Sequence, residues 1–353
     1  MLAERSMSAQ RGLDIRLLRI HPLLIWLCGL SWVLLSLNST ADDARAEWTA
    51  STEAKSLYTT DAFQFSNARQ LRLSDDPTQP AGVNIGKSED LIFQPALELV
   101  RSSSSFLGPN EVALKAEGSI YTNNPIFNHG DYRVQFKQSL TPQMSLLVRY
   151  RYQPNLFLGP NFEHRTGESL IAQERVTSHH WRAELERHIT KDITLTAIGR
   201  YGLRFYNEAF AERDTRFWTS GPKITYRVLS DLTVRLGYLY ERGLADGMGN
   251  TQFNDDVSYR LHFVSFETEI GLNPLFSLTL MYHYVRKNFT SDLTGDTHVG
   301  RQDETHQGIA ELLYHLTEAA GLTVGFQHTQ RTSTNALREF NDSIVSVGGQ
   351  YRF

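Results

Sequence analysis

The chain has 353 residues, a formal net charge of −4 and a mean hydropathy of −0.36. This balance of charge excludes the strongly basic surface that nucleic-acid-binding proteins use. The sequence contains a single cysteine, Cys28, which excludes a framework of structural disulfides.

The amino-terminal segment has the pattern of a cleaved export signal. Arginines precede an apolar run at residues 23–37 (LLIWLCGLSWVLLSL), and an Ala-Arg-Ala tripeptide at 44–46 supplies a cleavage box. The apolar run is shorter than the roughly 18 to 20 residues that a spanning helix needs. The sequence therefore predicts a signal peptide over residues 1–46 and a mature chain that begins at Glu47. Because Cys28 falls within the signal, we expect no thiol chemistry in the exported protein.

Downstream of Glu47, apolar and polar residues alternate over long segments. In LTVRLGYLYE (residues 232–241), large apolar residues occupy the even positions from 232 to 240, and threonine, arginine, glycine and one further leucine lie between them. Segments at 144–152, 193–205 and 276–287 repeat the pattern. A shift of one residue would move basic side chains into hydrocarbon at roughly 2 to 4 kcal/mol each. The alternation predicts strands with one face toward lipid and one toward water.

Short and long connections alternate between these strands. Short links with turn residues fall at 140–143, 190–192, 229–231, 272–275 and 318–321, and longer polar segments lie between them. Tight periplasmic turns and larger outer loops are typical of outer-membrane barrels, which have an even number of strands in bacteria. We expect one all-β domain over residues 47–353, an antiparallel up-and-down transmembrane β-barrel. Its fourteen strands are expected near 54–66, 89–101, 110–122, 130–140, 143–154, 173–189, 192–206, 214–229, 232–244, 256–271, 276–290, 303–317, 321–332 and 341–353. Without the first of them, the alternative is twelve strands and a periplasmic amino-terminal arm.

The last eleven residues, SIVSVGGQYRF, place apolar or small side chains at every second position and end on an aromatic residue. This segment resembles the closing strand of Gram-negative outer-membrane β-barrels, in which the barrel-assembly machinery reads a terminal aromatic. The resemblance implies that Tyr351 and Phe353 form an insertion signal and that the protein lies in the outer membrane. It also implies that outer-membrane lipid, lipopolysaccharide and the assembly machinery are its partners.

Charged residues gather on the face that is predicted to point into the barrel. The predicted pore-lining residues are Arg133, Lys137, Arg149, Arg151, Arg200, Arg204, Lys223, Arg227, Arg235, Glu267, Glu269 and Glu311. We expect the bases on one wall and the acids, together with Glu184 and Glu186, in the facing region. Such a transverse field across a water-filled pore selects small polar or anionic solutes. The competing interpretation is a lumen plugged by salt bridges. A fourteen-stranded barrel is intermediate in size between the small barrels that side chains fill and the large barrels that enclose an open channel.

The sequence thus predicts a porin-like channel for the passive diffusion of small hydrophilic solutes, anionic ones included. The first alternative is an accessory barrel that exports or assembles a surface polymer or lipoprotein. An outer-membrane hydrolase is the other, and Ser178, His179 and His180 are its candidate residues. Adjacent histidines on a strand point to opposite faces, and no third catalytic partner is evident. No enzymatic activity and no cofactor are predicted.

Three outer segments have distinctive composition. Two acidic, glycine-containing segments at 246–256 (DGMGNTQFNDD) and 292–303 (DLTGDTHVGRQD) offer oxygen ligands for Ca²⁺ or for a divalent bridge to lipopolysaccharide. Neither follows the EF-hand spacing, and we interpret them as solvated loop charge. The partly apolar segment at 156–172 is interpreted as a loop that folds into the pore or extends outward.

Overall fold

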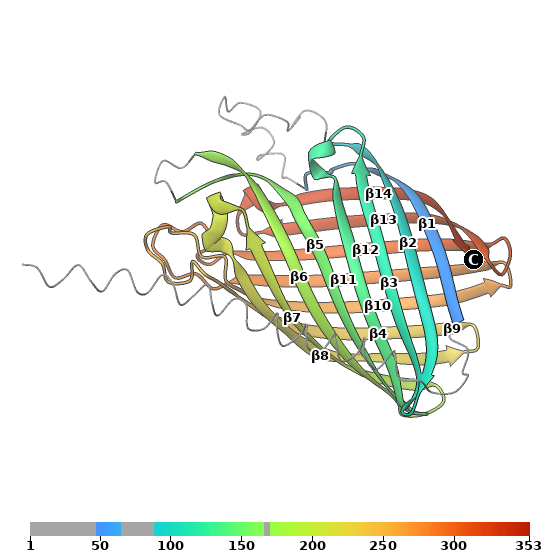
Figure 1. Ribbon diagram of the computed structural model, residues 1–353. Coiled ribbons are helices and arrows are strands. Elements are labelled where there is room, and N and C mark those ends of the chain that lie inside the picture. Colours follow the sequence, from blue (N-terminus) through green and yellow to red (C-terminus); the bar gives the residue numbers. More distant parts are fainter. Residues whose placement is uncertain (1–46, 65–87, 166–169) are drawn as a thin grey trace, which may run out of the picture. The chain divides into compact units, whose positions relative to one another are not determined.

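The computed structural model describes residues 47–64, 88–165 and 170–353. In them, fourteen antiparallel strands form a closed barrel, in which each strand pairs with its sequence neighbours and β1 pairs with β14 (Figure 1). The strands are β1 (Glu47–Thr59), β2 (Asp90–Ser105), β3 (Gly108–Tyr121), β4 (His129–Thr141), β5 (Met144–Phe162), β6 (Ile171–His188), β7 (Ile193–Tyr206), β8 (Thr215–Leu229), β9 (Leu232–Ala245), β10 (Tyr259–Asn273), β11 (Phe276–Phe289), β12 (Gln302–His315), β13 (Ala320–Ser333) and β14 (Phe340–Arg352). Three short 3-10 helices accompany them, η1 (Pro125–Phe127), η2 (Glu208–Arg213) and η3 (Ala336–Arg338).

The fourteen-stranded barrel predicted from the sequence is confirmed, and the twelve-stranded alternative is wrong. The predicted signal peptide, residues 1–46, lies outside the described residues. Within the described part of the chain, no helix combines the length and the apolar character needed to cross a membrane.

The outer wall of the barrel is an apolar belt. In β9, Leu236 is 51% exposed and Tyr238 is 41% exposed, whereas the adjacent Leu239 is only 5% exposed. Exposed leucine, valine, phenylalanine and tyrosine side chains recur on the same face of the other strands. A closed antiparallel barrel pairs its backbone groups internally, and an outward apolar band is what contact with hydrocarbon requires.

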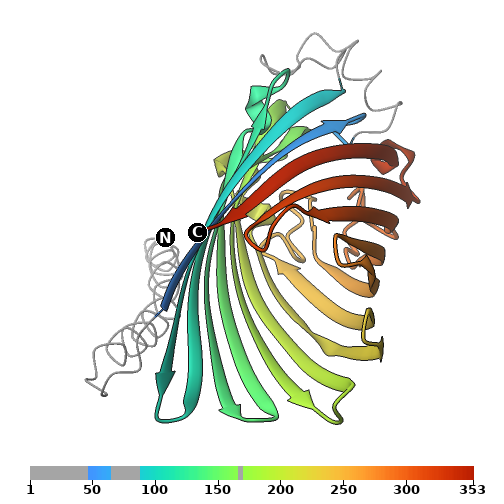
Figure 2. The ribbon, with the colours of Figure 1, turned by 90° about the vertical axis from the view of Figure 1, so that its right-hand side faces the viewer.

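Short turns and longer connections lie at opposite ends of the barrel. Two-residue links join β2 to β3, β4 to β5, β8 to β9 and β10 to β11, while η1, η2 and η3 lie in connections at the other end. The start of β1 and the end of β14 are at the short-turn end, where Figure 2 shows the blue and red strands side by side. By the usual orientation of such barrels, the short turns are periplasmic and the long connections extracellular.

The first strand lies seven residues earlier than predicted, at Glu47–Thr59 instead of 54–66. The hydroxyl of Thr59 donates to Oδ1 of Asp342 at 2.7 Å, and the backbone N–H of Asp61 donates to the same oxygen at 3.1 Å. These hydrogen bonds end the strand. The chain then turns, and the side chain of Phe63 packs in an apolar cluster, where it is 4% exposed.

The segment 156–172, predicted to be a loop, is mostly strand. β5 and β6 stay paired as far as Phe162 opposite Ile171. Asn155 and Gly159 have positive φ angles of 50° and 119°, and the register shifts at both positions. These bulges bend the hairpin without ending it. The loop interpretation is therefore wrong for residues 156–162 and 171–172, which are strand.

Candidate pore and extracellular mouth

Contacts between strands that are not neighbours identify the inner face of the barrel. Nζ of Lys55 on β1 lies 3.2 Å from Oε2 of Glu311 on β12, although β13 and β14 separate the two strands. Arg204 on β7 donates from Nη1 to the hydroxyl of Tyr259 on β10 at 2.7 Å, across β8 and β9. Such contacts cross the concave side of the sheet. The strand register then assigns every second residue to the interior.

The register places all of the predicted pore-lining residues on the face of Lys55 and Glu311. Their role in lining an open pore stays a prediction. The structure shows how these inward residues are grouped and which of them make hydrogen bonds or ion pairs.

Three arginines lie side by side on the inner face of β5, β6 and β7. Arg149 is directly opposite Arg182, and Arg182 is directly opposite Arg200. Arg149 donates to the side-chain oxygen of Gln135 at 2.6 and 2.9 Å, and Nε of Arg182 lies 2.6 Å from Oε1 of Glu184. Among the described residues, Arg200 has no hydrogen-bonding or ion-pair partner, and its Nε atom is buried. We call Arg149, Arg182 and Arg200 the arginine row.

A second group of cations adjoins the arginine row. Arg133 and Arg151 are opposite each other on β4 and β5, and both bind Asp131. Nε of Arg133 lies 2.7 Å from Oδ1 of Asp131, and Nε of Arg151 donates to the other oxygen. Glu117 lies 3.7 Å from Arg133. The side chains of Arg133 and Arg151 remain 31% and 40% exposed, so solvent reaches both guanidinium groups.

The acids do not form a separate wall facing the bases, and that prediction is wrong. Arg235 lies 2.6 Å from Glu267 and 2.9 Å from Glu269, and Lys223 lies 3.7 Å from Glu184. The reason is the register, which sets Glu267 directly opposite Arg235 on the neighbouring strand. Base and acid therefore pair locally around Arg235, while cations predominate at the arginine row.

Closer to the extracellular end, aromatic rings hold the inward cations. The guanidinium of Arg204 lies 4.4 Å from the ring centroid of Phe217, and its partner Tyr259 donates to Oε1 of Glu241 at 2.6 Å. Nζ of Lys287 lies 4.2 Å from the ring centroid of Tyr259. Aromatic faces attract such cations, and Nη2 of Arg204 also lies 3.9 Å from Oε1 of Glu241.

Arg213 of η2 joins outer segments that are far apart in the sequence. Its Nη1 lies 2.8 Å from Oε1 of Glu174 on β6, and its Nε lies 2.6 Å from Oδ2 of Asp255 in the β9–β10 connection. All three residues are buried. Burial alone would lower the pKa of the Arg213 guanidinium, but the two carboxylates outweigh burial and raise it. Arg213 is therefore a fixed positive charge that links β6, η2 and the β9–β10 connection.

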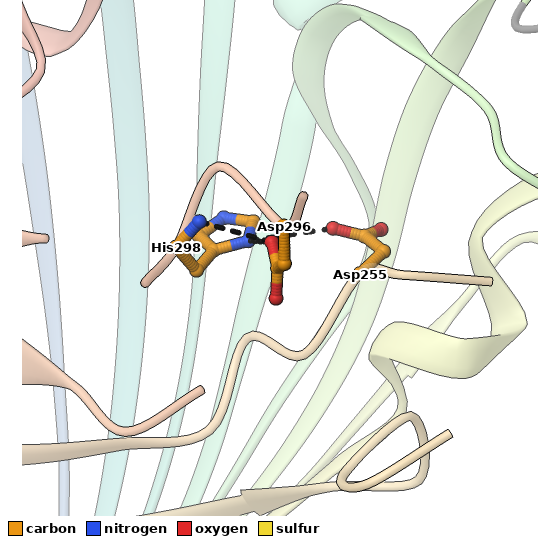
Figure 3. A group of neighbouring side chains, drawn as sticks. All are labelled: Asp255, Asp296 and His298. Atoms are coloured by element: carbon orange, nitrogen blue, oxygen red, sulfur yellow. Dashed lines mark hydrogen bonds and ion pairs between the residues drawn. The ribbon is translucent and has the colours of Figure 1, made fainter. Parts of the chain in front are cut away.

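The network continues from Asp255 into the β11–β12 connection (Figure 3). Nδ1 of His298 lies 3.5 Å from Oδ1 of Asp255 and 2.8 Å from Oδ1 of Asp296. Burial raises the pKa of Asp296, but hydrogen bonds from His298 and Ser291 outweigh it and lower the pKa to about 2. The two acidic segments, interpreted from the sequence as solvated, thus contribute buried carboxylates that meet. Their charge is tolerated inside because Arg213 lies beside it.

Asp255, Asp296 and His298 also have donor atoms within 4.8 Å of one another, as a metal site would. Their contacts favour a different role. Both carboxylate oxygens of Asp255 accept from Arg213, at 2.6 and 3.2 Å. Oδ1 of Asp296 already accepts from the backbone and the ring of His298. A metal ion would compete with a guanidinium that already balances these charges, and we interpret the group as a cross-link between outer connections.

An apolar cluster fixes another part of the extracellular end. Phe63 follows β1, Phe127 lies in η1 and Phe157 lies in β5, and all three are buried. The ring centroid of Phe127 is 5.4 Å from that of Phe63 and 5.1 Å from that of Phe157. The cluster therefore ties the start of the β1–β2 connection to the extended β5–β6 hairpin.

The residues considered for hydrolysis do not form a catalytic group. His179 lies on the outer face, where its Nδ1 is 2.8 Å from the hydroxyl of Tyr150. His180 lies on the inner face, where its ring packs edge-on against Phe217 at 5.3 Å. The prediction that adjacent histidines point to opposite faces is confirmed. Ser178 is buried and pairs in register with Arg204, an inward residue.

At the periplasmic end, the predicted insertion signal is accessible. The rings of Tyr351 and Phe353 meet edge to face at 4.8 Å, and Phe353 is 71% exposed. The backbone N–H of Phe353 donates to the carbonyl of Ala50 at 2.8 Å, which holds the chain end against β1. Lys137 and Arg227 are exposed nearer this end, and among the described residues neither makes an ion pair.

Sequence reasoning missed several inward residues. Arg182 lies on the same face of β6 as Glu184 and Glu186, because the three occupy alternate positions. The alternation that assigned those acids to the interior therefore also predicts an inward Arg182. Lys55 lies within the first predicted strand, at 54–66, but was not assigned to the pore-lining residues. Nothing in the alternation revealed that Asp131 would bind two arginines at once.

No protein-family model matches the chain, and no curated protein matches it. Among solved structures, the outer membrane channel DcaP of Acinetobacter baumannii has a TM-score of 0.51 at 12% identity, covering 89% of this chain and 99% of that one. A bacterial polysaccharide outer membrane secretin has a TM-score of 0.48 at 9% identity, with coverages of 86% and 98%. An anion-selective porin from Comamonas acidovorans has a TM-score of 0.45 at 7% identity, with coverages of 88% and 99%. The similarity to DcaP concerns the fold alone. Together with the closed topology and the apolar belt, it makes this chain a transmembrane β-barrel with the fold of an outer membrane channel.

Proposed function

We propose that the protein is a channel for the passive diffusion of small hydrophilic solutes, with a preference for anions. The arginine row carries the proposal. Like charges directly opposite each other on neighbouring strands destabilise a sheet, and three in succession are tolerated where water and passing anions solvate them. Of the carboxylates in the described residues, Glu184 alone binds the row, through Arg182.

The solvent exposure of side chains on the inner face supports an open lumen over a plugged one. The side chain of Arg182 is 25% exposed, and those of Arg133 and Arg151 are more exposed still. At the periplasmic end, a cavity of about 410 Å³ is lined mainly by polar residues, Glu53 and Lys115 among them. Buried charge in a dry lumen would be costly unless it were fully paired, and Arg200 has no partner among the described residues.

The cations are arranged in steps along the barrel. An anion entering from outside would meet Arg204 and Lys287 first, and then the arginine row together with Arg133 and Arg151. Several weak sites in succession allow a solute to enter and leave, as conduction requires. The outer connections that Arg213 cross-links lie at the extracellular end, where they would limit the size of solutes that pass.

Planar lipid bilayers test the proposal. The purified barrel should give discrete conductance steps, and a salt gradient should give a reversal potential of the sign for anion preference. Absence of conductance from folded protein would favour a plugged barrel or an accessory export role.

For export and assembly, we propose that residues 1–46 are removed as a signal peptide and that Tyr351 and Phe353 are read by the barrel-assembly machinery. The exposure of Phe353 supports this role, because a recognition signal must be reachable. Deletion of Phe353 should lower the amount of folded barrel in the outer membrane. Wild-type amounts of heat-modifiable protein would contradict it. We also propose that the outer wall contacts lipopolysaccharide.

A further inference from the structure

Two arginines face the membrane side of the barrel near its extracellular rim. Arg242 on β9 and Arg260 on β10 are directly opposite each other in the register, and both are exposed. They lie on the face of the exposed Leu236 and Tyr238, away from the lumen. Among the described residues, neither makes an ion pair or a side-chain hydrogen bond. We call Arg242 and Arg260 the outer arginine pair.

The outer arginine pair lies at the boundary between the apolar belt and the aqueous phase. One step toward the membrane centre, Tyr240 is opposite His262, and Tyr238 lies 2.8 Å from Nδ1 of His262 through its hydroxyl. Aromatic side chains of this kind mark the headgroup level of a membrane. The pair therefore lies at the depth of lipid headgroups.

The neighbouring residues provide the surroundings of a lipid site. Trp218 on β8 is directly opposite Arg242 and is 47% exposed. On the next strand, Arg286 is held by other contacts, because it donates to Gln302 at 2.9 Å and lies 3.8 Å from Glu304. In the part of the chain that the structure describes, neither Arg242 nor Arg260 has an acidic side chain within ion-pair distance.

From this arrangement we propose that the outer arginine pair binds a phosphate group on the headgroup of an outer-leaflet glycolipid. Two like charges opposite each other on neighbouring strands repel, and a phosphate between them turns repulsion into charge-assisted hydrogen bonds. Aromatic surface beside the pair suits a sugar, and Leu236 and Phe266 below it suit acyl chains. The inference rests on the proposed contact of the outer wall with lipopolysaccharide, for which it names a site, and it goes beyond solute passage.

Native mass spectrometry of the purified full-length mature barrel in detergent tests the proposal, with bisphosphorylated lipid A as the probe. The double variant Arg242→Gln/Arg260→Gln should bind the probe about tenfold or more weakly, because two charge-assisted contacts are lost. Dephosphorylated lipid A should bind the wild type as weakly as the probe binds the variant. The matched control, Arg101→Gln/Arg187→Gln, removes two outward arginines at the periplasmic end and should bind like the wild type.

Equal binding of the probe by the wild type and the outer-pair variant would overturn the proposal, as would equal binding of dephosphorylated lipid A by the wild type. Full displacement of the probe by millimolar inorganic phosphate would also overturn it, since the site would then be one for free phosphate. Heat-modifiable gel mobility confirms that each variant is folded. Bilayer conductance of the outer-pair variant should match the wild type, so this proposal and the channel proposal can fail separately.

Discussion

Arg182 on β6 lies directly between Arg149 on β5 and Arg200 on β7, all three on the inner face of the barrel. Three adjacent strands thus present like charges at one level, with Gln135 and Glu184 as the partners of two of them. An arrangement that is unfavourable in a dry sheet is suited to a wet pore that attracts anions.

Ion selectivity should shift in opposite directions when Arg235 is neutralised and when its two acidic partners, Glu267 and Glu269, are neutralised. Arg235→Gln leaves Glu267 and Glu269 without their base and should move the reversal potential toward cation preference. The double variant Glu267→Gln/Glu269→Gln should move it toward anion preference, because Arg235 is then uncompensated. Reversal potentials in planar bilayers under one salt gradient measure both. Shifts of the same sign would contradict the inward placement of this group.

Loss of Arg213 should loosen the extracellular mouth. Arg213→Met leaves Glu174 and Asp255 as buried carboxylates without their base, a change that costs about 3–5 kcal/mol in comparable pairs. Limited proteolysis should then cut within 246–258 or 290–301 in the variant. Arg216→Met is the matched control, since Arg216 is exposed and lies 3.9 Å from Asp246. Equal protease resistance of both variants would show that the network does not hold the loops.

Acid should release the β11–β12 connection. The pKa of Asp296 is lowered from its usual value near 3.8 to about 2, so the folded loop favours the ionised carboxylate. Its contribution to stability is complete above about pH 4 and is lost as the pH falls toward 2. Hydrogen exchange of residues 290–301 should therefore accelerate over that interval in the wild type. In Asp296→Asn the exchange should be faster at neutral pH and should change less on acidification; an identical pH profile would exclude Asp296 as the responsible group.

One glycine should be essential for closing the β8–β9 hairpin. A Cβ atom on Gly221 would lie 2.0 Å from the carbonyl oxygen of Tyr238, which is backbone and cannot swing away. Gly221→Ala should therefore destabilise the barrel by at least about 1–3 kcal/mol, as overpacking does. Gly199→Ala, where no atom lies within 4 Å, is the control. The fraction of heat-modifiable protein after assembly measures both, and equal fractions would be inconsistent with this backbone approach.

Strand number and the periplasmic turns were predictable because charge and hydropathy alternate strictly where lipid covers one face and water the other. The β1 strand was placed wrongly because Thr52, Ser56 and their neighbours alternate weakly, and because its end depends on Asp342, a residue almost the whole chain away. The mouth was not predictable for a similar reason. Asp255 and Asp296 become buried only because Arg213 reaches them from a third connection, and no local pattern encodes that meeting.

The most direct test of the channel proposal is the reversal potential of the triple variant Arg149→Gln/Arg182→Gln/Arg200→Gln beside that of the wild type, in planar bilayers under the same salt gradient. Because the replaced side chains face the lumen, no lipid-facing position changes and folding should persist. The proposal predicts anion preference in the wild type and a marked shift toward cation preference in the variant, with conductance steps retained. A folded, conducting variant with unchanged selectivity would contradict the claim that the arginine row sets the field of the pore.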